Sequence, residues 1–317
     1  MPSRVQVQAV SAAIWFSALI ASTLLVVVSA PASGLHIAID VYPSLQVLAT
    51  IGVLVLLALK TARIAPRISM VAASYLVVWV GGLAGAILSM VGTMFRFPFI
   101  DRWLAAADAA LGLTTADVVS LVVAVPSAAE LLYCIYFLSV ALLFLTAFGL
   151  AVLGRAERLW EFCATYAFCL AVATICSLVL PAAGAFEYLG LERVYGHQLP
   201  PGSGVYSLEV LHAIRNSSRM VINPMELYGL VTFPSFHTAM ALMTAAAWRD
   251  DRYLRWPMFI WNALVILSTL PIGGHYLVDV IAGALTWFLV FRYGAAWANT
   301  IISARSDATA PALAADL

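Results

Sequence analysis

Residues 127–153 read SAAELLYCIYFLSVALLFLTAFGLAVL, and Glu130 is the one charged residue in this run. A helix of about 20 apolar residues crosses the hydrocarbon core of a bilayer. With this run, the chain has eight candidate segments: 9–30, 44–60, 68–92, 127–153, 159–181, 230–248, 256–272 and 275–295. The sequence therefore predicts an all-α, polytopic membrane helical bundle with about eight transmembrane helices, within a range of six to eight.

The composition supports a membrane protein and argues against other classes. Hydrophobic residues make up 63% of the chain and charged residues 10%, whereas a soluble domain carries about 25% charged residues. The net charge of zero and the lack of a basic cluster give no sign of a nucleic-acid partner. We interpret the four cysteines as buried apolar residues without disulfides, and we expect neither a metal nor a cofactor. The cysteines are Cys134, Cys163, Cys169 and Cys176.

The loop charges predict the orientation. Lysine and arginine concentrate in the cytoplasmic loops of membrane proteins. With the N-terminus inside, eleven of the sixteen basic residues fall on the inner side. We therefore expect a multi-pass cell-membrane protein with both termini cytoplasmic.

The apolar run at 9–30 is longer than the core of a usual signal peptide, which favours an uncleaved first helix. Residues 1–305 are expected to form one integral membrane domain, and the Ala/Asp-rich segment 306–317 a disordered tail.

Two short motifs each place a histidine where an apolar helix should begin. They are Phe233-Pro234-Ser235-Phe236-His237-Thr238 and Gly273-Gly274-His275-Tyr276-Leu277-Val278-Asp279. Ser235 is a natural N-cap, and its helix is short enough that its start should lie below the outer membrane surface. Gly274 lets a phosphate approach the backbone, and helix N-termini favour anions. The predicted orientation places both motifs on the outer face.

The residue types in these motifs suit phosphoryl transfer. His275 and Asp279 are four residues apart, so we expect both on one face of the same helix. One histidine can attack phosphorus, a carboxylate can orient it, and a second histidine can protonate the leaving group. Arg215 and Arg219, just upstream, are candidates for holding phosphoryl oxygens.

Each of these residues also has a structural interpretation. The His–Asp pair can be a polar contact, His237 a satisfied histidine at a helix start, and the arginines can lie at the membrane interface. Their occurrence together on one predicted face favours catalysis.

The motifs resemble those of the type 2 phosphatidic acid phosphatase superfamily. The Pro-Ser-x-His motif of that family is matched by Pro234–His237. Its Ser-Arg…His…Asp motif is matched by Ser268, His275 and Asp279, with Thr269 in the place of the arginine. The family's first motif, a lysine and an Arg-Pro pair, is absent.

The resemblance implies roles for three residues and a substrate class. His275 would be the nucleophile, Asp279 its partner and His237 the general acid. It also implies a helical-bundle core, spanning about residues 205–297, that acts without metal on a lipid phosphate at the outer face. Ser235, Gly274, Arg215 and Arg219 are then the predicted phosphate-binding residues.

A resemblance to one subgroup leaves open which molecule accepts the phosphoryl group. The His-Tyr-x-x-Asp form of residues 275–279 and the stretch Asp101–Gly112 are similar to the fungal inositol phosphorylceramide synthases. The chain is thus expected to be a lipid phosphate phosphatase or phosphotransferase that works through phosphohistidine. An inositol phosphorylceramide synthase-like head-group transferase is one alternative. The expected partners are a lipid phosphate or phospholipid substrate and membrane lipids; whether the chain forms a homo-oligomer is left open. A proton-coupled transporter, with the histidines and Asp279 as a proton relay, is the alternative of another class.

Overall fold

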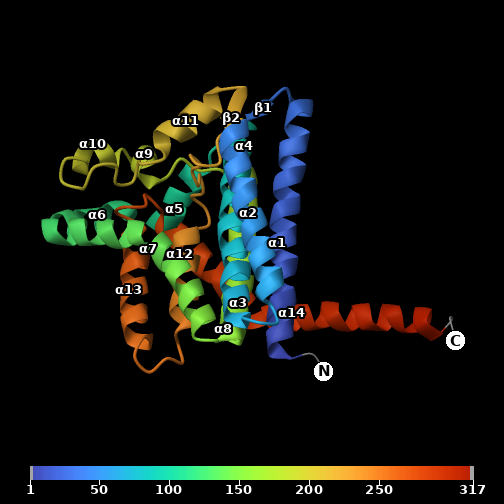
Figure 1. Ribbon diagram of the computed structural model, residues 1–317. Coiled ribbons are helices and arrows are strands. Elements are labelled where there is room, and N and C mark those ends of the chain that lie inside the picture. Colours follow the sequence, from blue (N-terminus) through green and yellow to red (C-terminus); the bar gives the residue numbers. More distant parts are fainter. Residues whose placement is uncertain (1–2, 315–317) are drawn as a thin grey trace.

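The structure is a computed structural model that describes residues 3–314. Helices make up almost all of the regular structure in this range (Figure 1). The α-helices are α1 (Arg4–Ser29), α2 (Val41–Thr61), α3 (Pro66–Tyr75), α4 (Gly81–Met94), α5 (Asp101–Leu111), α6 (Thr115–Val123), α7 (Pro126–Val152), α8 (Ala156–Val179), α9 (Ala185–Leu189), α10 (Leu191–Tyr195), α11 (Leu208–Asn216), α12 (Phe236–Ala247), α13 (Arg255–Ser268) and α14 (Leu277–Ala314). The predicted all-α membrane bundle is confirmed.

Six helical segments of the described chain are long and apolar enough to cross a membrane. They are Arg4–Ser33, Val41–Thr61, Pro66–Met94, Ser127–Val152, Ala156–Val179 and Leu277–Gly294. The third joins α3 and α4 through a π-helical turn at Leu76–Val80. A seventh is reached if α5 and α6, which are bent by 73° at their junction, count as one broken span. The number agrees with the lower part of the predicted range.

The predicted segments 230–248 and 256–272 form helices that are shorter than the others. Helix α12 has 12 residues and α13 has 14. A 12-residue helix is only about 18 Å long, well below the thickness of the hydrocarbon core. Pro234 and Ser235 delay the start of α12, and the turn at Gly273 and Gly274 follows α13. Both motifs are therefore at helix ends inside the bundle.

Helix α8 forms the centre of the bundle. It packs against α1, α4, α12 and α14, and Leu159, Cys163 and Cys169 on it are fully buried. The prediction of buried cysteines is confirmed for these two, whereas Cys134 is exposed on α7. Helices α12 and α14 both pack against α8 and also against each other.

The two ends of the bundle differ in character. At the lower end in Figure 1 are the turn between α7 and α8 and the turn between α12 and α13, and ion pairs connect these two regions. Arg155 pairs with Asp251 at 2.5 Å, and Arg249 pairs with Glu161 at 2.9 Å. The upper end carries α9 to α11 and a parallel pair of strands, β1 (His36–Ile39) and β2 (Arg219–Ile222). This ladder was not expected from the sequence, because its strands are only four residues long and lie 183 positions apart in register (219 against 36).

Helix α14 extends beyond the bundle. The structure shows residues 306–314 as its last turns, where the composition predicts a disordered tail. Residues 315–317, the rest of the predicted tail, are outside the described part.

Candidate active site

The N-terminus of α12 is fixed to α14 through Ser235. Ser235 has extended backbone dihedrals, and its side chain accepts a hydrogen bond from the backbone N–H of Thr238 at 3.4 Å, so the predicted N-cap is confirmed. Its own backbone N–H donates to the carbonyl of Asp279 at 3.0 Å. On α14, a Cβ at Gly283 would be 2.2 Å from the Ser235 carbonyl oxygen, so only glycine permits this approach. The two motifs are thereby held in contact.

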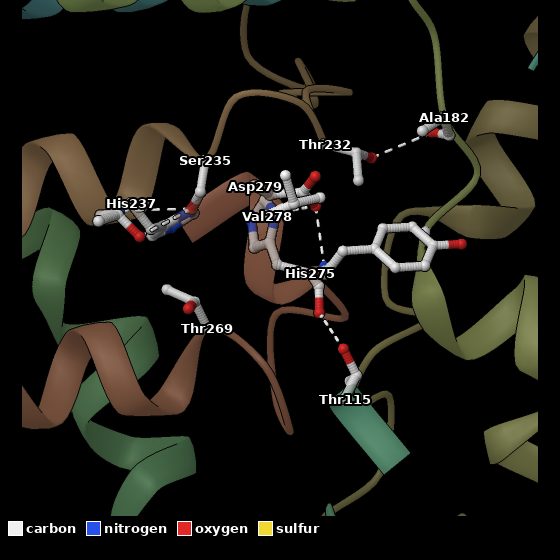
Figure 2. A network of polar contacts seen from close by, with 12 residues as sticks. Thr115, Ala182, Thr232, Ser235, His237, Thr269, His275, Val278 and Asp279 are labelled. Atoms are coloured by element: carbon white, nitrogen blue, oxygen red, sulfur yellow. Dashed lines mark hydrogen bonds and ion pairs between the residues drawn. The ribbon is translucent and has the colours of Figure 1, made fainter. Parts of the chain in front are cut away.

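Asp279 orients His275, but not in the way that the spacing predicts. Helix α14 begins at Leu277, so His275 lies in the turn before it rather than on its face. Asp279 Oδ2 lies 3.3 Å from Nδ1 of His275 and accepts a 2.9 Å hydrogen bond from the backbone N–H of Tyr276 (Figure 2). The same carboxylate thus caps the start of α14 and contacts the imidazole of His275.

The backbone of the turn at residues 273–276, which carries His275, is held from three sides. The N–H of His275 donates to the carbonyl of Thr269 at 3.1 Å, and the hydroxyl of Thr115 donates to the carbonyl of His275 at 2.8 Å (Figure 2). Gly274 has φ +75°, and its carbonyl accepts from the N–H of Ala185 at 2.8 Å. A Cβ at Gly274 would lie 2.6 Å from the carbonyl oxygen of Gly204, so the turn requires glycine there.

Two buried carboxylates on α5, for which the sequence predicts no role, anchor this turn. Asp108 accepts hydrogen bonds from the backbone N–H groups of Leu277 and Val278. Asp101 accepts from the N–H of Gly184 and from the hydroxyl of Tyr276. The one available signal was their place in the Asp101–Gly112 stretch, which the subgroup resemblance had singled out.

His237 faces His275 across the site. Their ring centroids are 6.4 Å apart, and both side chains appear with Ser235 and Asp279 in Figure 2. The hydroxyl of Tyr136, on α7, lies 3.3 Å from Nδ1 of His237. The structure therefore brings together His237, His275, Asp279, Ser235 and Gly274.

Two cavities border the histidines. A small cavity of about 30 Å³ beside His275 is lined by loop backbone and glycines, including Gly184, Gly204 and Gly274. A larger cavity of about 470 Å³ beside His237 is lined mainly by apolar residues of α4, α7, α8 and α12. Tyr206 lines both cavities. The first suits a small polar group, and the second suits a hydrocarbon chain.

The two predicted phosphate-binding arginines lie elsewhere in the described structure. The guanidinium of Arg215 donates to the carbonyls of Arg96 and Phe97 and lies 4.0 Å from the centre of the Phe99 ring. Burial lowers the pKa of Arg215, and the nearby charge of Arg96 lowers it further. Arg219 begins β2 and is exposed. Neither residue lines the cavity beside His275, and their role in phosphate binding stays a prediction.

The described residues contain no group of three or more His, Cys, Asp or Glu side chains arranged to hold a metal ion.

Comparison with known proteins identifies the family. An uncharacterized protein of Methanocaldococcus jannaschii is 35% identical over 60 residues, which are 19% of this chain and 25% of that relative. The chain thus spans about a quarter of the length of that relative. No solved structure matches the chain significantly. The model of the PAP2 superfamily matches residues 102–293, from the start of α5 into α14. This range includes His237, His275, Asp279 and Asp108, and Asp101 lies directly before it, and so this multi-pass membrane protein belongs to the PAP2 superfamily.

Proposed function

We propose that this protein cleaves or transfers the phosphoryl group of a membrane lipid through a phosphohistidine intermediate. The observation that carries the proposal is the pairing of two histidines, 6.4 Å apart between ring centroids, of which one has a buried carboxylate at Nδ1. This arrangement supplies a nucleophile with an orienting group, and an acid on the opposite side of a bound phosphate.

In the first step, Nε2 of His275 attacks phosphorus. The bond between phosphorus and the leaving alcohol oxygen breaks, and His237 gives its proton to that oxygen. Asp279 stabilises the positive charge that develops on His275. The cavity lined by Gly274 receives the phosphate, and Ser235 fixes the end of α12 beside it.

In the second step, an acceptor hydroxyl attacks the phosphohistidine. His237 takes the acceptor's proton as the bond between phosphorus and nitrogen breaks. Water as acceptor gives a phosphatase, and an alcohol gives a transferase.

The lipid nature of the substrate is supported by the cavity beside His237. Its walls come from membrane-spanning helices and are mainly apolar, so a hydrocarbon chain is its natural occupant. We place this site on the outer face, because the arginine-rich turns of the bundle lie at the opposite end. The catalytic core, about residues 205–297, then depends on α5, α6 and α7, which lie outside it.

The inositol phosphorylceramide synthase-like reaction is the second candidate. Asp101 and Asp108 lie in the stretch that carries the subgroup resemblance. Asp108 accepts a hydrogen bond from the backbone N–H of Leu277, next to the turn that carries His275, and Asp101 accepts one from the N–H of Gly184. A proton-coupled transporter would use the same histidines, but the anchored turn at Gly274 is more useful for holding a phosphate than for alternating access.

The deciding experiment identifies both products. Purified protein is incubated with lipid phosphates and phospholipids, with and without inositol or a lipid alcohol, and the products are separated. Free phosphate indicates hydrolysis, and a new lipid phosphodiester indicates transfer. The absence of both, with proton flux in proteoliposomes, would favour the transporter.

A further inference from the structure

Tyr136 on α7 makes two contacts with His237. Its ring stacks on the imidazole, with centroids 4.4 Å apart and planes 25° from parallel. Its hydroxyl lies 3.3 Å from Nδ1, and Nε2 of His237 has no hydrogen-bond partner among the described residues. Tyr136 is almost completely buried, at 2% exposure.

A second tyrosine continues the contact. The hydroxyl of Tyr206 lies 3.0 Å from that of Tyr136. A hydroxyl can accept one hydrogen bond and donate another. Nδ1–H of His237 can therefore donate to Tyr136 while the Tyr136 hydroxyl donates to Tyr206, and every member of this chain is satisfied.

We propose that Tyr136 is a positioning residue that keeps Nδ1 of His237 protonated, so that Nε2 is the nitrogen that gives up and takes back the catalytic proton. The proposal rests on the proposed function. In the first step the proton on Nε2 of the imidazolium moves to the leaving oxygen, and the neutral ring keeps Nδ1–H on Tyr136. In the second step Nε2 takes the proton of the acceptor hydroxyl. Without Tyr136 the neutral ring can hold its proton on Nε2, where it cannot act as a base.

The first test separates the hydroxyl from the ring. Tyr136→Phe keeps the stacked ring and removes the hydrogen bond. We expect kcat for a lipid phosphate to fall about tenfold, the effect of one lost hydrogen bond, with KM unchanged. With a nitrophenyl phosphate, whose leaving group needs no proton, the rate of the cleavage step should fall much less. That rate is measured as the burst of nitrophenol. Tyr133→Phe is the matched control. It lies one turn earlier on α7, its ring packs on Phe137, and its hydroxyl has no hydrogen bond among the described residues.

A double variant tests whether Tyr136 acts through His237. Tyr136→Phe should cause little further loss in the His237→Ala background. Additive losses, or an equal loss of the burst and of lipid turnover, would overturn the proposal.

The second test does not require turnover. The chain has five histidines, and in protein labelled with ¹⁵N-histidine the His237 signals are those that disappear in His237→Ala. At a pH where His237 is neutral, their shifts should report protonated Nδ1 in the wild type and a tautomer mixture in Tyr136→Phe. Protonated Nε2 in the wild type would refute the assignment even if the enzyme is active. A wild type with protonated Nδ1 and no phosphoryl transfer would instead refute the proposed function alone.

Discussion

The carboxylate of Asp108 on α5 accepts a 2.8 Å hydrogen bond from the backbone N–H of Leu277, the first residue of α14. It accepts a second, of 2.9 Å, from Val278. A helix start leaves such N–H groups without an intrahelical partner, and a negative charge beside them is favourable. A residue 169 positions away thus fixes how α14 leaves the turn that carries His275.

Asp108→Ala should lower both stability and activity, because it leaves two half-buried N–H groups without their acceptor. We expect a loss of about 1.5–3 kcal/mol in the free energy of unfolding, measured as a lower midpoint of thermal unfolding in detergent, with a lower kcat. Asp117→Ala is the control, since the Asp117 carboxylate accepts hydrogen bonds only from Thr114, at the start of its own helix, among the described residues. A variant of Asp108 with normal unfolding and normal kcat would contradict its anchoring role.

His275→Ala and His237→Ala should differ in what they preserve. The first removes the nucleophile, so no phosphoenzyme forms with any substrate. The second removes the acid and should lower turnover of lipid phosphates by about 10²–10⁴-fold. It should retain phosphoenzyme formation from nitrophenyl phosphate, whose leaving group needs no proton. If both variants lose activity on both substrates to the same extent, the assigned roles are wrong.

Arg215→Ala should lower the midpoint of thermal unfolding, because its guanidinium holds the carbonyls of Arg96 and Phe97. The loss of two such bonds costs on the order of 1–3 kcal/mol. Arg193→Ala, at an exposed site on α10, should leave the midpoint unchanged and should cost less activity than Arg215→Ala. A raised KM with unchanged unfolding would instead assign Arg215 to the phosphate, as the sequence predicts.

A cysteine at Ser218 should react with a membrane-impermeant thiol reagent in intact cells. Ser218 is exposed and precedes β2, at the end of the bundle that we place outside. Arg252→Cys, in the exposed turn between α12 and α13, should react only after permeabilisation. The unmodified protein gives the background from Cys134, which is also exposed. The reverse pattern would place the site on the cytoplasmic face.

Activity should survive excess chelator and be inhibited by vanadate, which mimics five-coordinate phosphorus. This follows from a mechanism in which helix ends and histidine supply the positive charge. Rapid quenching with labelled substrate should trap acid-labile, base-stable label on His275, and Asp279→Asn should slow its appearance. Loss of activity in chelator, restored by a divalent metal, would refute this mechanism.

The sequence by itself determined the elements and their local chemistry. Apolar runs set the membrane helices, because hydrocarbon forces the backbone to satisfy its own hydrogen bonds. Ser235 was predictable as an N-cap, and Asp279 as the partner of His275, because both contacts span only three or four residues.

Only the tertiary structure decided what surrounds the two histidines. Tyr136 lies 101 positions from His237, and Asp108 lies 169 positions from Leu277. Nothing local distinguishes Tyr136 from Tyr133, one turn earlier on the same helix. The direction in which α7 packs against α12 selects one tyrosine over the other. Similarly, Arg215 looked like a phosphate ligand because it precedes the first motif, but the packing of α11 on α4 turns its guanidinium toward the backbone of Arg96 and Phe97. Such contacts depend on how helices pack in three dimensions, and spacing along the chain does not encode that packing.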